Sequence, residues 1–167
     1  MQYCPRCGAN VEGLTQRCDC CGMTLNPQIS LFKWHTFMMQ ASGDLFYYAN
    51  KVFRKLEAID KTKYNGCVQN VELNLYCYPD EIICSEKLKN NVYFIRSSRK
   101  IRVNIVIDFN TYILGDSIAK ELRVIDAVQA GVQIAVDRAK RANINIDSLL
   151  TDVEKLLSNS ERRFFTT

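Results

Sequence analysis

A four-cysteine pattern at the N-terminus constrains this chain more than any other feature of its 167 residues. Two C-x-x-C-G units place four thiols in the first 21 positions: Cys4, Cys7, Cys18 and Cys21. In each unit a glycine follows the second cysteine, and glycine permits the sharp backbone turn that brings both thiols to one ion. Four thiolates are the closed, tetrahedral ligand set of a structural zinc site. The pattern therefore predicts a zinc ribbon that spans residues 1–26 and binds one Zn²⁺.

A segment of this length has almost no hydrophobic core, so the metal would supply its folding free energy. A catalytic zinc is not expected, because four thiolates leave no open position for water. The alternatives are a disulfide pair or free buried cysteines, but paired short spacings in an intracellular chain favour metal. Cys20 lies inside the second unit, and the C-x-x-C-G frame leaves it as a spare thiol.

The first residues contain no basic segment followed by an apolar one, as a secretory signal peptide would. No apolar run approaches the ~20 residues that span a bilayer. We therefore expect a cytoplasmic protein without membrane association, in which thiols stay reduced. Three further cysteines lie in or near apolar stretches, and we expect them to be small buried hydrophobes: Cys67, Cys77 and Cys84.

Residues 27–167 indicate one α+β domain that follows a linker at residues 25–28. Hydrophobic periodicity predicts strands at 29–39, 67–78, 92–96 and 100–109 and helices at 44–60, from 117 and from 147. We expect a mostly antiparallel sheet, packed on one face by a long helix and two shorter ones. Gly131 lies inside the long helix, where glycine costs about 1 kcal/mol relative to alanine. Close packing at this position is the expected reason for it.

Catalytic motifs are absent from the sequence. His35 is the single histidine and follows Trp34 in an apolar strand, so we expect a packed or surface residue rather than a base. The sequence contains no glycine-rich phosphate loop and no G-x-S-x-G motif. Asp108 and Asp116 flank a strand-to-helix connection and are interpreted as a strand-end carboxylate and a helix cap. The expectation is a protein that is not an enzyme.

Positive charge is concentrated in residues 86–102, which hold six basic residues and one acidic residue. Three interpretations are open: a solvated sheet face, a phosphate-binding surface in which Tyr93 and Phe94 interleave with the charges, or a surface that docks an acidic protein. The predicted ribbon is neutral, with two arginines and no lysine. Nucleic-acid modules usually carry a concentrated basic footprint, so the ribbon disfavours the phosphate interpretation.

One stretch resembles a known family. Tyr93-Phe94-Ile95-Arg96 leads through a basic hairpin and an alternating strand into residues 108–116, and a long helix follows. This order resembles the immunity proteins of bacterial polymorphic-toxin and contact-dependent inhibition systems, in outline over residues 28–158 and in detail over 91–145. The resemblance implies a non-enzymatic cytoplasmic protein that neutralises one cognate toxin by tight protein–protein binding.

Four hairpin residues are of the types that anchor protein interfaces, and we expect them to contact the partner: Tyr93, Arg96, Arg99 and Arg102. The alternative function is a zinc-ribbon nucleic-acid-binding or regulatory protein.

The ligand assignment predicts unequal effects of cysteine substitution. Cys4→Ser or Cys21→Ser should abolish zinc binding and unfold the ribbon, because each removes one of four ligands. Cys20→Ser should retain one zinc per chain. The measurement is the metal content of the purified variants, and zinc loss from Cys20→Ser would overturn the assignment.

Overall fold

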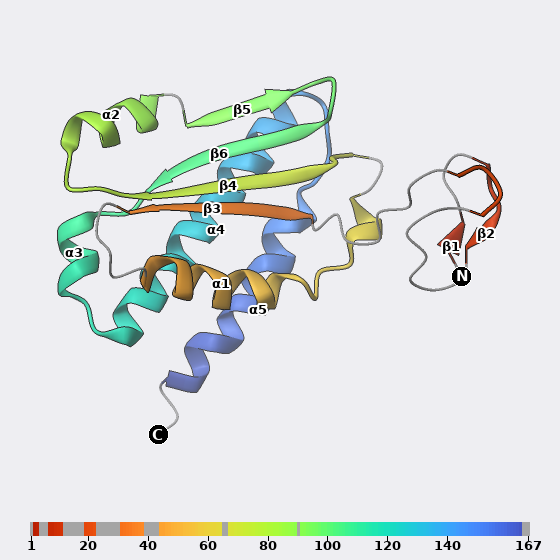
Figure 1. Ribbon diagram of the computed structural model, residues 1–167. Helices are drawn as coiled ribbons and strands as arrows, with labels where there is room; N and C mark the ends of the chain where they lie inside the picture. The colour runs from red at the N-terminus through yellow and green to blue at the C-terminus, as the bar shows by residue number, and fades with distance from the viewer. Residues whose placement is uncertain are drawn as a thin grey trace. The chain divides into compact units, whose positions relative to one another are not determined.

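The computed structural model describes residues 2–3, 7–11, 19–22, 31–38, 44–64, 67–89 and 91–164 (Figure 1). The chain divides into two compact units, Met1–Ser30 and Leu31–Thr167. The domain boundary predicted between residues 26 and 27 lies outside the described residues. In the first unit, β1 (Gln2–Tyr3) and β2 (Asn10–Val11) form an antiparallel pair.

The second unit is α+β, as predicted. Its sheet has four strands in the order β3-β4-β6-β5: β3 (Phe32–Met38), β4 (Asn70–Cys77), β6 (Lys100–Val106) and β5 (Val92–Ile95). All four predicted strands are present in shortened form. The basic hairpin expected after Tyr93–Arg96 is present, because β5 and β6 pair antiparallel on either side of residues 96–99.

The prediction of a mostly antiparallel sheet is wrong. β3 pairs with β4 in parallel, β4 pairs with β6 in parallel, and the antiparallel pair is β5 with β6. Parallel neighbours need a long crossover, and helix α1 (Asp44–Leu56) lies in the connection between β3 and β4. Alternation of polar and apolar residues is typical of antiparallel sheets. In this sheet the alternation shows only that one face is apolar and the other polar.

The described residues contain five α-helices, two more than predicted. Besides α1 they are α2 (Glu81–Lys89), α3 (Phe109–Leu114), α4 (Ser117–Arg141) and α5 (Ser148–Phe164), and a short 3₁₀ helix, η1, spans Lys61–Lys63. The two unpredicted helices lack a periodic apolar stripe, since α2 buries no residue and α3 has six residues. Among the described residues, no helix combines the length and apolarity that crossing a membrane requires.

Capping residues fix both ends of α4. The Asp116 carboxylate accepts a hydrogen bond from the Ala119 backbone N–H at 2.8 Å, which confirms the predicted cap. Asp108 also caps a helix, because its carboxylate accepts from the Thr111 N–H at the start of α3. At the other end of α4, Asn143 adopts a left-handed backbone with φ of 58°, and the Ile144 N–H bonds to the Ala139 carbonyl. This is the Schellman arrangement that ends a helix.

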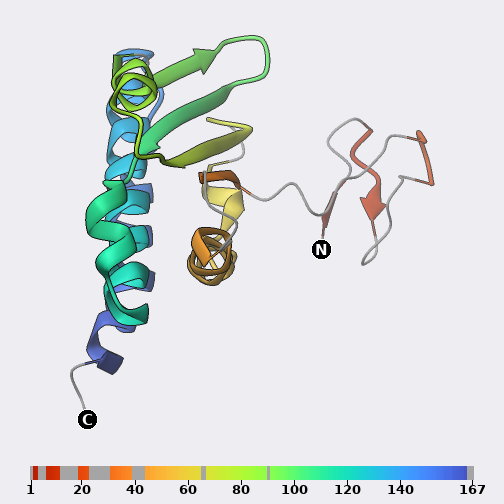
Figure 2. The same cartoon turned by 60° about the vertical axis from the view of Figure 1, so that its left-hand side comes forward.

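Helices α4 and α5 lie on one side of the sheet, and α1 runs beside β3 (Figures 1 and 2). Alternate strand residues point toward these helices and form the core with them: Val71, Leu73, Leu75, Cys77, Ile101, Val103 and Ile105. Gly131 lies where α4 meets the centre of the sheet. A Cβ atom there would be 2.3 Å from Ile105 Cδ1 and 3.2 Å from Leu73 Cδ2. The expected close packing at Gly131 is confirmed.

Gly131→Ala should lower the free energy of unfolding by about 1 kcal/mol, because the overpacking penalty exceeds the gain in helix propensity. Ile105→Val removes the Cδ1 atom and should cost about 1 kcal/mol in the natural chain. In the Gly131→Ala background the same change should cost much less, since it relieves the clash. Urea unfolding followed by circular dichroism measures the coupling, and simple additivity of the two changes would contradict the proposed contact.

Candidate interaction surface

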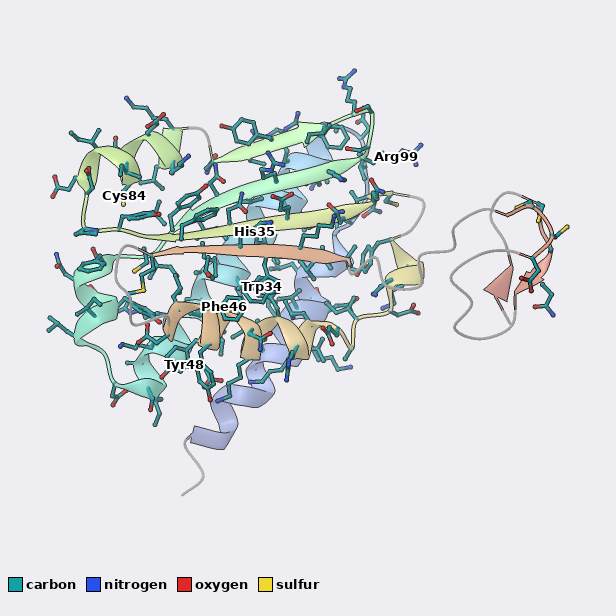
Figure 3. The ribbon with its side chains drawn as sticks, in the orientation of Figure 1. Trp34, His35, Phe46, Tyr48, Cys84 and Arg99 are labelled. Atoms are coloured by element: carbon teal, nitrogen blue, oxygen red, sulfur yellow. The ribbon has the colours of Figure 1, made fainter. Side chains whose placement is uncertain are left out.

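The face of the sheet opposite the helices is lined by the alternate strand residues, and we call it the open face. No helix packs across its centre in the part of the chain that the structure describes. Helix α2 lies beside β6 at one corner. Figure 3 labels His35 on β3, at this face. The open face carries Lys33, His35, Phe37, Asn70, Glu72, Asn74, Tyr76, Tyr93, Ile95, Lys100, Arg102, Asn104 and Val106.

A row of charged side chains crosses the open face. Strand register places Lys33, Glu72 and Arg102 side by side on β3, β4 and β6. The Glu72 carboxylate lies 3.2 Å from Arg102 Nε and 3.8 Å from His35 Nε2. The Arg102 and His35 side chains are 44% and 58% exposed. Pairs that face solvent to this extent contribute about 1 kcal/mol or less to stability. The row is therefore accessible to a partner. His35 is a surface residue, as expected.

Two short polar side chains lie at the centre of the open face. Asn74 Nδ2 donates a hydrogen bond to Asn104 Oδ1 at 3.2 Å, and both residues are more than nine-tenths buried. Among the described residues, Asn74 Oδ1 has no hydrogen-bond partner. Longer side chains stand beside the pair, with Glu72 and Tyr76 two positions away on the same strand. The pair therefore forms a polar floor between taller neighbours.

An aromatic stack borders this floor. Phe37 and Tyr76 are register neighbours on β3 and β4, and their rings stack at 4.6 Å between centroids with planes 9° apart. The Lys87 ammonium from α2 lies 5.1 Å from the centroid of the Tyr76 ring. Such cation–π contacts are worth about 0.5–1 kcal/mol at exposed sites. Tyr76 is therefore already in contact with both an aromatic ring and a cation.

The structure brings two of the four predicted anchor residues together. Tyr93 and Arg102 are register partners on β5 and β6 and share the open face, and Tyr93 is 44% exposed. Arg96 and Arg99 lie in the turn between the two strands instead. Arg99 stands at the tip of the hairpin, where its backbone is left-handed with φ of 49° and its carbonyl accepts a hydrogen bond from the Gln69 N–H (Figure 3).

The residues at the centre of the open face were not among the predicted contact residues. Strand alternation in residues 70–77 already placed Glu72, Asn74 and Tyr76 on one side of a strand. Asparagine is depleted in strands. The presence of Asn74 and Asn104 in two predicted strands was therefore the sequence feature that could have identified the site.

A second polar cluster lies at the carboxyl ends of the strands and holds the fold together. The Asp44 carboxylate accepts hydrogen bonds from Tyr112 Oη at 3.1 Å and from Lys120 Nζ at 2.6 Å. Burial, together with the nearby Asp44 carboxylate, raises the pKa of Tyr112. The same two causes raise the pKa of the fully buried Cys77 thiol to about 11. Cys77 is thus the predicted buried hydrophobe and not a nucleophile. Cys67 and Cys84 are half-buried and form no disulfide.

The N-terminal unit shows one feature of a zinc ribbon. Gly8 and Gly22 follow the second cysteine of each C-x-x-C unit, and both have left-handed backbones with φ of 71° and 69°. This is the turn expected after the second ligand of each unit. Cys4 and Cys18 lie outside the described residues. Among the described residues alone, no group of three or more Cys, His, Asp or Glu side chains is arranged to hold a metal ion.

No protein-family model, curated protein or solved structure matches this chain.

The raised pKa of the Cys77 thiol predicts its reactivity. In the folded protein at pH 8, Cys77 should not react with a disulfide reagent, because it is buried and protonated. Cys20 is exposed and should react at once. Mass spectrometry of the labelled peptides measures both, and urea should make the two sites equally reactive. Rapid labelling of Cys77 without denaturant would contradict its buried state.

Proposed function

We propose that this chain is a non-enzymatic cytoplasmic binding protein that neutralises a cognate bacterial toxin domain, and that the open face is its contact surface. The observation that carries the proposal is a bare face on a sheet whose core strands are parallel. All-parallel sheets occur almost only with both faces covered, and this mixed sheet has two parallel pairings and one antiparallel pairing. A covering partner would explain why this face lacks a packed layer in the described chain.

The residue types on the open face fit a tight protein interface. Binding energy in such interfaces comes mostly from a few tyrosine, tryptophan and arginine residues near the centre. Tyr93 and Arg102 are adjacent and partly exposed here, and the Phe37–Tyr76 stack adds rigid apolar area. Rigid aromatic groups lose little conformational entropy on binding. A standard interface buries about 1,600 Å² in total, so it would extend beyond the sheet face.

The toxin assignment rests on the resemblance of residues 91–145 to the immunity family. Neutralisation would be steric, because a bound domain that covers the toxin's active site excludes its substrate. No acid–base pair or nucleophile of this chain takes part in that mechanism.

The N-terminal unit is proposed to bind one structural zinc ion through Cys4, Cys7, Cys18 and Cys21. Support comes from the two C-x-x-C-G units and from the left-handed backbones of Gly8 and Gly22. The ion would supply folding free energy to the ribbon and no chemistry.

Substitutions on the open face test the proposal in a direct assay. The probe is any toxin C-terminal domain that a neighbouring gene encodes, purified and titrated calorimetrically with the full chain. Arg102→Ala and Tyr93→Ala should each weaken binding about 30-fold, the equivalent of about 2 kcal/mol. Arg141→Ala and Tyr47→Ala are matched controls, because Arg141 ends α4 and the exposed Tyr47 lies on α1.

The controls should bind as the natural chain does. Equal losses from all four variants would show that the contact is not on the open face. A natural chain that neither binds the toxin domain nor protects cells that express it would refute the proposed function itself.

A further inference from the structure

The Asn74 side chain is costly to the isolated protein. Its Oδ1 atom is buried and has no hydrogen-bond partner among the described residues. A buried carbonyl that has lost water and gained no donor destabilises the fold. Asparagine is also disfavoured within strands, and Asn74 lies in the middle of β4, between β3 and β6. The unpartnered Asn74 Oδ1 atom therefore calls for a reason outside the fold.

The position of Asn74 shows where a donor would come from. Register places His35 on one side of it and Asn104 on the other, and Asn104 already takes the Asn74 amide hydrogen. The side chain projects on the open face, away from the helices. Neighbouring side chains cover Oδ1 in the free protein, so a donor from outside the sheet reaches it when the Glu72 row or the Phe37–Tyr76 stack moves aside.

We infer that Asn74 Oδ1 accepts a hydrogen bond from the bound toxin, an inference that rests on the function proposed above. The toxin segment that supplies this donor also carries a carboxylate beside it. The carboxylate follows from charge complementarity. Among the described strand residues, the open face presents one acidic side chain, Glu72, against three basic ones: Lys33, Lys100 and Arg102.

The same observations favour a polypeptide over a nucleic acid. Single-stranded nucleic acids bind by stacking bases on aromatic rings that are free to receive them. The Tyr76 ring is stacked on Phe37 and contacts Lys87, and the 44% exposed Tyr93 ring alone is a poor platform for successive bases. A polypeptide brings single donors and carboxylates that fit between these groups.

Leucine has nearly the shape of asparagine and no polar side-chain atoms. A leucine substitution therefore removes the proposed hydrogen bond to the toxin while it preserves the packing of the sheet. Asn74→Leu combined with Asn104→Leu removes both members of the pair together. The double variant should keep or raise the melting temperature, by roughly 3 °C. It should nevertheless bind the toxin at least 10-fold more weakly, because the toxin's donor then lacks an acceptor.

Asn70→Leu is the matched control. Asn70 lies four residues earlier on the same strand, is 1% exposed, and has no partner for either amide atom among the described residues. Its replacement should also preserve or raise the melting temperature, but it should leave toxin affinity unchanged because Asn70 begins β4, outside the interval between the Glu72 row and the Phe37–Tyr76 stack. Lys33→Glu should slow association at low salt at least fivefold, since it reverses a charge that attracts the carboxylate.

The experiment measures toxin affinity by calorimetry and melting temperature for the natural chain and these variants. Weaker binding with a preserved melting temperature, confined to the Asn74/Asn104 variant, supports the inference. Unchanged affinity in that variant, or equal loss in Asn70→Leu, overturns it while the proposed function stands. A fall in melting temperature that accompanies the lost binding assigns the pair a structural role and also overturns it.

Two further outcomes are decisive. If the natural chain fails to bind the toxin domain, the proposed function and this inference fall together. If the natural chain instead binds a labelled single-stranded 12-nucleotide RNA, and the Asn74/Asn104 variant loses that binding, the face recognises nucleic acid and the polypeptide assignment is wrong.

Discussion

The close approach of α4 to the centre of the sheet is the contact on which the rest of this structure depends. Gly131 allows the helix backbone to meet Leu73 on β4 and Ile105 on β6 without an intervening side chain. The helix thereby packs across the two inner strands. The apolar alternate residues of both strands point toward it and form the core. What remains on the other side is the polar half of each strand. The packing of α4 on one face of the sheet thus determines that the open face is polar.

Much of this layout follows from the sequence. Alternation in β4 and β6 identified which residues point to the core, and Asp116 marked the start of α4. Strand direction could not be read in this way, because alternation reports burial and not orientation. Helix α2 escaped prediction because it buries no residue, so its sequence carries no stripe with a helical period.

The candidate site was predicted only at its border. Tyr93 and Arg102 stood out because they lie in a basic stretch, and the structure places them on one face. Asn74 and Asn104 become neighbours only through the register of β4 on β6, and they are thirty residues apart in the chain. No local pattern encodes that register. A site assembled across parallel strands is therefore less visible in sequence than one built within a hairpin.

The inner position of β4 also affects the chain while it is being made. β4 pairs with β3 on one side and β6 on the other, yet β6 follows α2 and β5 in the chain. During synthesis the β6 side of β4 has exposed backbone donors and acceptors and an apolar face until residues 100–106 have emerged. Such an edge is a template for pairing with other strands. The nascent protein thus passes through an interval in which this unpaired edge of β4 can pair with strands of other chains.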